Sequence, residues 1–582
     1  MSRRLLVTGL LALVLAAPAA AQPRVLWPGV TFDTQLQFTP NGPVAINVLL
    51  GPRPGGTTTL EPALSNETLL GRETLTAMQQ RLSASATTAG VNADLFSLQT
   101  GLPSGVLLRQ TELLHPPHAA RSSAGLLGDG TLEVRRVSFF ATWQGAGPRR
   151  TLNELNAAAP PGGSALYTQA YGPATPAYTD AAAVVMFPFP AAVPGVDLPA
   201  PVVEARGGGP VPIPPGGAVL VARGAAAATL QAEAPAGSTL TARFVFRPDW
   251  PGLVAAVGGG PQIVRDGAPV FRAGEAFTSS QLGPRAPRSA IGQLRDGRVV
   301  LVAVDGRQPG YSVGLSNFEL AQALVRLGAV TGMALDGGGS TTMALEGSLL
   351  NRPSGGTERP ISTALLFSYS GVYVQPPLPV VSPDGDGVGD AQTLRYKLVR
   401  PATVTVTLRA PNRSVAFTET AERAPGLVDV PFPPVSTQGA GAATPLDGRW
   451  TLAVRAVDDL GRETTMAQSF KVNTTLGFLR APARLFLPPG GRDAPITWRQ
   501  GRSARVTVTI VDREGSAVRT LALRRYRPGE QGVVWNGLDR TRRRVKGGVY
   551  TARVVARNAL GTSELTAPIR VRQIAGPGRP SQ

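Results

Sequence analysis

The chain has 582 residues, which is enough for several domains of roughly 100 to 200 residues each. It contains no cysteine, which excludes disulfides, a cysteine nucleophile and a thiolate metal site. Its two histidines, His115 and His118, leave little material for a serine–histidine triad or a multi-histidine zinc site. The net charge is +19, but no run of basic residues is interleaved with aromatic residues, so nucleic acid is not an expected partner.

The N-terminus has the three parts of a secretory signal peptide. Arg3 and Arg4 precede an apolar run, which ends in the small residues Ala19 to Ala21. We therefore predict a signal peptide over 1–21 and an exported protein, which is periplasmic, displayed on the cell surface or secreted. The apolar run is too short to span a bilayer comfortably, and no later segment has the pattern of an integral membrane helix.

Residues 22–371 are expected to form one domain with an α/β fold, that is, an α+β arrangement around a mixed sheet. Alternating apolar runs between Val25 and Leu50 predict strands. Leu75, Met78 and Leu82 share one face of a predicted helix over 73–83, which leads into a strand at 91–96. The Pro- and Gly-rich stretch 160–217 is expected to form loops around the sheet, with strand-like pieces at 181–187 and 219–222.

Asn92 and Asp94 alternate with apolar residues in the predicted strand 91–96. Their side chains should therefore project to the face opposite Val91, Ala93 and Leu95. They are candidates for binding a substrate. The alternative is that they only hydrogen-bond the turn that follows, as Asn and Asp commonly do.

Two later strands are expected to end in a carboxylate. The buried run 299–304 is followed by Asp305, for which a simple turn residue is the alternative. The capping box Ser316 to Glu319 opens a helix that returns the chain to a strand ending at Asp336. The helix should fix where the Asp336 carboxylate points.

The segment around Asp336 is the strongest candidate for chemistry. Asp336 is followed by Gly337, Gly338 and Gly339 and then by Ser340, Thr341 and Thr342, between short apolar runs that predict strands. Glycine backbone can approach a ligand closely, and successive N–H groups can form a nest that binds an anion. The segment therefore predicts a carboxylate beside an oxyanion, most plausibly a phosphate. The alternative is a glycine-rich hairpin turn.

Several segments in order resemble the phosphodiester glycosidase family. They are Val91–Phe96 with Thr100–Gly105, Ala255–Gly267, Ala286–Gly292, Asp296–Arg307, the Asp336 segment and Asn351–Pro360. The resemblance spans roughly residues 25 to 370. It implies an exported bacterial hydrolase that cleaves the glycosidic bond of a sugar-1-phosphodiester in a phosphate-containing glycan or cell-envelope polymer, with no required cofactor.

The resemblance also implies roles for individual residues. A carboxylate is needed near the anomeric carbon, for which Asp336 is the first candidate and Asp305 the second. The candidates for binding substrate or phosphate are Arg288, Gly337, Gly338, Gly339, Ser340, Thr341, Arg359, Asn92 and Asp94. The competing hypothesis is a non-catalytic surface protein that binds exopolysaccharide. A metal-dependent phosphodiesterase is disfavoured, because no histidine-rich constellation is present.

The C-terminal part is expected to be all β. A Pro-rich linker at 372–380 precedes two units, 381–474 and 480–574, and a flexible tail at 575–582. Alternating strands in both units predict immunoglobulin-like sandwiches. Both units resemble the immunoglobulin-like domain of flagellar hook-capping proteins. Asp384, Asp386 and Asp390 could bind a structural Ca²⁺, or they could serve only the geometry of a turn.

Overall fold

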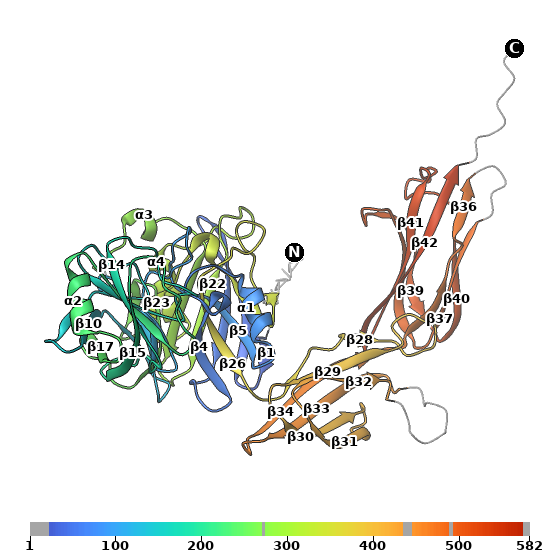
Figure 1. The fold of residues 1–582 in the computed structure, drawn as a ribbon. Helices are drawn as coiled ribbons and strands as arrows, with labels where there is room; N and C mark the ends of the chain where they lie inside the picture. The colour runs from blue at the N-terminus through green and yellow to red at the C-terminus, as the bar shows by residue number, and fades with distance from the viewer. Residues whose placement is uncertain (1–21, 271–273, 435–444, 488–492, 574–582) are drawn as a thin grey trace, which may run out of the picture. The chain divides into compact units, whose positions relative to one another are not determined.

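The computed structural model describes residues 22–270, 274–434, 445–487 and 493–573. Internal contacts divide the chain into two compact units, one of residues 1–83 with 88–369 and one of residues 84–87 with 370–582 (Figure 1). The expected signal peptide and the expected tail lie outside the described residues. Within the described ranges, no helix has the length and apolarity that a membrane crossing requires.

The first unit contains an antiparallel sheet that leads to Asp336. Its order is β1-β2-β3-β22-β21-β23-β19-β20, so strands from the start of the chain pair with strands from far along it. Ile46 in β3, for example, lies opposite Val304 in β22. The strands predicted between 25 and 50 and at 299–304 are confirmed. The bounds are β1 Arg24–Trp27, β2 Val30–Thr39, β3 Gly42–Gly51, β19 Gln262–Arg265, β20 Ala268–Pro269, β21 Arg288–Leu294, β22 Val299–Val304 and β23 Ala329–Ala334.

A second eight-stranded sheet has the order β11-β10-β17-β15-β14-β16-β13-β12. The prediction that 160–217 forms loops is wrong, because three of these strands lie there. Pro199 and Pro201 hid the longest of them, since proline within a run usually argues against a strand. The bounds are β10 Ser138–Gln144, β11 Arg150–Leu152, β12 Glu154–Leu155, β13 Ser164–Thr168, β14 Ala181–Met186, β15 Asp197–Gly207, β16 Ala218–Arg223 and β17 Thr239–Arg247.

Two five-stranded sheets complete the strands of this unit. Their orders are β7-β6-β18-β8-β9 and β25-β24-β5-β26-β4. In the second, Met343 pairs with Val91, which places the segment after Asp336 beside the Asn92 strand. The bounds are β4 Thr58–Leu64, β5 Thr87–Asn92, β6 Leu107–Arg109, β7 Glu112–His115, β8 Ser123–Leu127, β9 Leu132–Arg135, β18 Leu253–Gly258, β24 Met343–Leu345, β25 Ser348–Leu349 and β26 Thr363–Tyr369.

Helices are few and short, so the predicted α/β fold class is wrong: the described part of the first unit is nearly all β. The helices are α1 Leu75–Leu82, α2 Ala225–Glu233, α3 Ser279–Leu282 and α4 Asn317–Arg326, with 3₁₀ turns η1 Ser65–Glu67 and η2 Gly338–Ser340. One misleading signal was the predicted helix over 73–83 that leads into a strand, of which the structure has only the short α1. The apolar run of β22, all six residues of which are buried, was also compatible with a parallel sheet. Such runs are typical of parallel strands covered by helices, but here β22 pairs with antiparallel neighbours.

Helix α4 fixes the position of β23. The predicted capping box is present, because Ser316 accepts the amide of Glu319 and the Glu319 carboxylate accepts the amide of Ser316. Leu320 and Leu324 of α4 are fully buried in one cluster with residues of β21, β22 and β23. Each fully buried leucine contributes roughly 2 kcal/mol relative to an exposed one. The helix therefore holds β23 against the sheet, and β23 ends two residues before Asp336.

The second unit contains two β-sandwiches, as predicted from the alternating strands. The first combines the sheets β27-β29-β32 and β28-β34-β33-β30-β31. Tyr373 and Val374, within the expected linker, form a strand that pairs with β29. The bounds are β27 Tyr373–Val374, β28 Val380–Val381, β29 Gln392–Leu398, β30 Ala402–Arg409, β31 Val415–Arg423, β32 Gly426–Phe432, β33 Gly448–Asp458 and β34 Glu463–Val472.

The second sandwich repeats the strand order of the first. Its sheets are β35-β37-β40 and β36-β42-β41-β38-β39. Trp498 and Trp535 are fully buried between them and form the centre of the core. The bounds are β35 Leu476–Arg480, β36 Arg484–Leu487, β37 Ala494–Gln500, β38 Ala504–Val511, β39 Ala517–Tyr526, β40 Gly529–Trp535, β41 Gly548–Asn558 and β42 Gly561–Gln573.

Candidate functional site

Asp336 follows the end of β23 and is held in place by its own backbone. Its amide donates to the carbonyl of Ala93 at 2.8 Å, and its carbonyl accepts the side-chain amide of Asn92 at 2.6 Å. Both contacts bridge about 240 residues of sequence. The Asp336 side chain is half-buried. The fold therefore fixes the main chain and leaves the carboxylate facing a cleft.

Asn92 fixes the loop after β23 through several hydrogen bonds. Besides its bond to Asp336, its Oδ1 accepts the hydroxyl of Ser289 at 2.6 Å and the amide of Thr342 at 3.1 Å. Asn92 is buried, and it does not line the cleft beside Asp336. The side chain thus connects β5, β21 and the glycine loop. Its position suits a residue that positions Asp336.

The environment of Asp336 changes its acidity. Burial raises the pKa of the carboxyl from 3.8 to about 6, which exceeds the lowering by a hydrogen bond from Ser340, by the charge of Arg359 and by the amide of Gly337. At neutral pH the group is mostly ionised and poorly solvated. A carboxylate in this state is a stronger base than one in water.

The cleft beside Asp336 has a volume of about 490 Å³. Its polar lining comes from the loop after β23 (Asp336, Gly337 and Gly338), from the start of β21 and the segment before it (Arg288 and Arg285), from the segment after β22 (Arg307), from α3 (Ser280 and Gln281) and from the start of α4 (Asn317). Phe277 and Leu95 provide apolar wall. The cleft thus combines one carboxylate with three arginines.

Arg288 is directed by backbone carbonyls. Its Nε donates to Leu315 at 3.0 Å and its Nη2 donates to Pro284 at 2.8 Å, while Nη1 has no partner among the described residues. Burial, with a contribution from the charge of Arg307, lowers the pKa of Arg288 to about 10. The guanidinium is still a cation at neutral pH. It is therefore a preorganised donor for an anion.

Several residues of the cleft were missed by the sequence analysis, among them Arg285, Arg307 and Asn317. Arg307 lies after Asp305 with a φ of 58°, and its guanidinium approaches Gly338. Asn317 is 7% exposed and lines the cleft, and its Oδ1 has no hydrogen-bond partner in the described structure. Arg307 is the last residue of the segment Asp296–Arg307, which resembles the phosphodiester glycosidase family, and it lies two residues after the candidate Asp305. Asn317 was read only as the first residue of a helix.

The glycine loop offers fewer free amides than a phosphate nest requires. The amide of Gly338 donates to Pro287 at 2.8 Å, and those of Ser340 and Thr341 donate to Gly337 and Gly338 at 3.4 and 3.3 Å. A Cβ at Gly339 would meet the Arg359 guanidinium at 2.3 Å, so a side chain there would displace that guanidinium. The glycines thus provide space more than amide donors.

The remaining residues of this loop lie behind the cleft wall. Ser340 is fully buried, hydrogen-bonds Asp336 and accepts Nη1 of Arg359 at 3.4 Å. Thr341 is buried, and its hydroxyl has no partner among the described residues. Arg359 does not line the cleft. Ser340 and Arg359 therefore act on Asp336 rather than directly at the cleft.

Asp305 is fully committed to internal hydrogen bonds. One carboxylate oxygen accepts the side-chain amide of Asn351 at 2.9 Å and the amide of Arg352 at 3.0 Å. The other accepts Asn47 and Tyr311, both at 3.1 Å. Asp305 is 1% exposed and does not line the cleft. The structure gives it the contacts of a residue that ties β22 to the 351 loop.

Asp94 is buried as well. Its Oδ2 accepts the amide of Gly105 at 2.6 Å, and Gly258 packs so closely that a side chain there would meet the same oxygen. Burial, followed by a smaller contribution from the charge of Asp336, raises the pKa of Asp94 to about 7. The side chain bonds the turn that follows β5, which matches the structural alternative for this residue.

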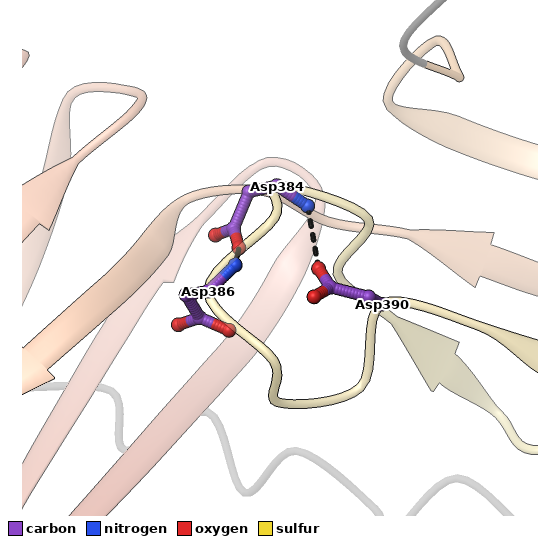
Figure 2. Close-up of side chains that lie close together, drawn as sticks. All are labelled: Asp384, Asp386 and Asp390. Atoms are coloured by element: carbon purple, nitrogen blue, oxygen red, sulfur yellow. Dashed lines mark hydrogen bonds between the residues drawn. The ribbon is translucent and has the colours of Figure 1, made fainter. Parts of the chain in front are cut away.

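The three aspartates 384, 386 and 390 form a compact loop in the second unit (Figure 2). One oxygen from each lies within 4.8 Å of the others. Their carboxylates already accept amides: Asp390 accepts those of Asp384 and Gly387 at 2.9 and 2.7 Å, and Asp386 accepts that of Phe478 at 2.7 Å. Such oxygens could still ligate Ca²⁺, but the loop is also complete as a set of turns.

Comparisons with known proteins bear on both units. Residues 198–368 match the family model described as phosphodiester glycosidase, and residues 489–559 match the FlgD Ig-like domain. The resemblances inferred from the sequence are thereby confirmed. The first match includes Arg288, Arg307 and Asp336.

Individual relatives share short stretches with this chain. The SPbeta prophage-derived uncharacterized protein YomE of Bacillus subtilis (strain 168) is 36% identical over 107 residues, which cover 18% of this chain and 16% of that protein. The N-acetylglucosamine-1-phosphodiester alpha-N-acetylglucosaminidase of Bos taurus is 40% identical over 67 residues, or 12% of each chain. The chain thus matches less than a fifth of the length of these relatives.

A solved structure is similar over a longer range. The crystal structure of a hypothetical protein from Synechocystis is 28% identical and has a TM-score of 0.49, with coverage of 59% of this chain and 62% of that chain.

Proposed function

We propose that the protein cleaves the glycosidic bond of a sugar-1-phosphodiester. The match of residues 198–368 to the phosphodiester glycosidase family supports a hydrolase that acts on phosphodiester-linked sugars. The observation that carries the proposal is the half-buried Asp336 carboxylate, with a pKa raised to about 6, in a cleft shared with Arg288 and Arg307. We propose further that the protein is exported and acts on a phosphate-containing glycan or cell-envelope polymer.

In the proposed reaction the bond between the anomeric carbon and the phosphate oxygen breaks. The bonding electrons leave with the phosphomonoester, and water supplies the hydroxyl of the released sugar. The transition state resembles an oxocarbenium ion, so a carboxylate close to the anomeric carbon stabilises it. Asp336 has this role, as nucleophile or as base for water. Its poor solvation increases both abilities.

The leaving group needs charge stabilisation more than a proton, because a phosphomonoester is already an anion. Arg288 presents a free Nη1 on a side chain that is held by backbone carbonyls, and Arg307 presents an exposed guanidinium close to Gly338. Fixed cations at the site of developing charge lower the barrier without a cost of reorganisation. The proposal assigns no step to a metal or a cofactor.

Asn317 adds a further polar group to the proposed site. Its buried Oδ1 lacks a hydrogen-bond partner among the described residues, and an unpaired buried acceptor is costly. Because Asn317 lines the cleft, we propose that its side chain turns toward a bound sugar and accepts a hydroxyl group there. The same side chain opens α4, so it is held in place by the helix that carries it.

The experiment is hydrolysis of a panel of sugar-1-phosphodiesters and UDP-sugars by the purified protein, with and without chelator. Asp336→Asn is the test variant, and Asp296→Asn, at an exposed turn, is the matched control. Sugar released by the wild-type protein and by the control, unaffected by chelator and absent with Asp336→Asn, would support the proposal. Turnover by Asp336→Asn at the wild-type rate would contradict it. Binding of anionic glycans without any turnover would favour the non-catalytic alternative.

A further inference from the structure

Three arginines lie side by side on the outer face of the second sandwich. Arg505 in β38 is directly opposite Arg525 in β39 and also opposite Arg557 in β41. All three side chains are exposed. Since adjacent strands are about 4.8 Å apart, the row spans about 10 Å across the sheet. We call these three residues the arginine row.

Within the described residues the three row arginines have no ion-pair partner, in contrast to Arg553 in the same sheet. Arg553, also in β41, pairs with Glu564 at 2.7 Å. Of the three row arginines, only Arg525 has a side-chain partner among the described residues, the hydroxyl of Ser503. Like charges directly opposite each other destabilise a sheet. The arrangement therefore costs stability unless an anion from outside binds it.

The first sandwich has the same strand order, so it shows which residues the fold accepts at the positions that correspond to the arginine row. Its strand β30 reads Ala-Thr-Val-Thr-Val-Thr-Leu-Arg, and β38 reads Ala-Arg-Val-Thr-Val-Thr-Ile-Val, in the same position of an identical strand order. The counterpart of Arg505 is Thr403, which lies opposite Glu422 and Val457 and donates its hydroxyl to Glu422. The sandwich fold thus forms without a basic residue at these positions.

The row lies in a groove rather than on a flat face. The groove has a volume of about 1210 Å³, and the row arginines line it together with Arg502 and Arg524. Arg502 pairs with Asp447, which is the one carboxylate among the described residues that line the groove. Arg524 stacks on the ring of Tyr526 at 4.6 Å. Arg502 is thus neutralised, while the row stays available.

From this geometry we propose that the arginine row is a binding site for a polyanionic glycan that carries phosphate groups. Planar guanidinium groups bind phosphate with paired hydrogen bonds, and three of them in a line fit charges repeated along a chain. The groove has no exposed aromatic ring on which bases could stack, since Tyr526 is buried, which disfavours nucleic acid. The choice of phosphate rests on the proposed function of the first unit, but the site does not require turnover.

The test is the affinity of the full chain for poly(glycerol phosphate), measured at low and high salt, with single-stranded DNA and neutral dextran as the other arms. Arg505→Thr copies the residue of the first sandwich, and Arg513→Thr removes the same charge in the hairpin turn at the other end of β38. We expect Arg505→Thr to weaken binding of the phosphate polymer about tenfold and Arg513→Thr to leave it unchanged. Neutral dextran should not bind.

Several results would overturn the proposal. One is equal affinity of the wild-type protein and Arg505→Thr for the phosphate polymer. A second is a higher affinity for single-stranded DNA than for that polymer. The melting temperature separates binding from folding, because Arg505→Thr relieves repulsion in the row and should not lower it. Failure of the glycosidase assay would leave this binding result in place, so the two proposals fail separately.

Discussion

The cleft of the first unit and the arginine row of the second use the same side chain in opposite ways. In the cleft, Arg288 is held by backbone carbonyls and lines the same cavity as a carboxylate whose pKa is raised. In the row, Arg505 is exposed between two other arginines without an acid. Arginine that is buried and directed is suited to stabilise charge that develops in a reaction. Exposed arginine in a line is suited to hold charge that is already present.

The strongest way to break this comparison is to remove the carboxylate that distinguishes the cleft. Asp336→Asn should lower kcat/KM for a sugar-1-phosphodiester by about 1,000-fold, because the amide is neither nucleophile nor base. Retention of a phosphate polymer on the arginine row should persist in this variant. Steady-state kinetics and a polymer-binding assay on one preparation check both. Parallel loss of polymer binding would show that the two regions are not separate.

The next test concerns the geometry of the cleft arginine. Arg288→Lys keeps the charge but cannot reproduce a guanidinium whose Nε and Nη2 donate to backbone carbonyls while Nη1 stays available for an anion. We expect kcat/KM to fall about 100-fold. Arg298→Lys, at an exposed ion pair with Asp296, is the control and should have wild-type kinetics. If Arg288→Lys also had wild-type kinetics, the role assigned to Arg288 would be wrong.

The pH dependence should separate the two regions more finely. Asp336 acts as the ionised carboxylate, and its pKa of about 6 means that the inactive protonated form grows as the pH falls through 6. At pH 5 kcat/KM should be about tenfold below its plateau near pH 8. The row arginines remain charged from pH 5 to 8, so the affinity for the phosphate polymer should not change over this pH range. A flat kinetic profile from pH 5 to 8 would contradict the role of Asp336.

The smallest expected effect is in the aspartate loop, which belongs to neither arginine site. Asp386→Ala removes the acceptor of the Phe478 and Val388 amides and should lower the free energy of unfolding by about 1 kcal/mol. Thermal melts with added Ca²⁺ and with chelator test the second reading of this loop. A higher melting temperature with Ca²⁺ in the wild-type protein, absent in Asp386→Ala, would establish a cation site. Unchanged melts would leave the turn geometry as its function.

Local sequence patterns predicted those structural elements that are determined by residues close together in the chain. The capping box of α4, the strands of both sandwiches and the strand that leads to Asp336 all follow from spacing within about ten residues. The fold class did not follow, because a buried apolar run such as β22 looks the same whether helices or sheets cover it. Pro199 and Pro201 similarly hid a strand of the second sheet.

The composition of the candidate site shows the same limit. Asp336 could be singled out, since glycines and hydroxyl residues follow it in the chain. Whether Asn92, Asp94 and Asp305 face a ligand or the protein interior depends on contacts with residues far away in sequence. All three prove to be buried and hydrogen-bonded. Arg307 and Asn317 reach the cleft only because the sheet and α4 bring them there.

The pairing of β3 with β22 sets the order in which parts of the chain can become structured. Ile46 meets Val304, and Asn92 holds Asp336, across about 250 residues in each case. Contacts between distant segments form slowly, because a long loop must close first. Each sandwich instead contains hairpins between adjacent strands, such as β41 with β42. A full-length chain that refolds should therefore acquire the arginine row before the cleft, and enzymatic competence should be among the last properties to appear.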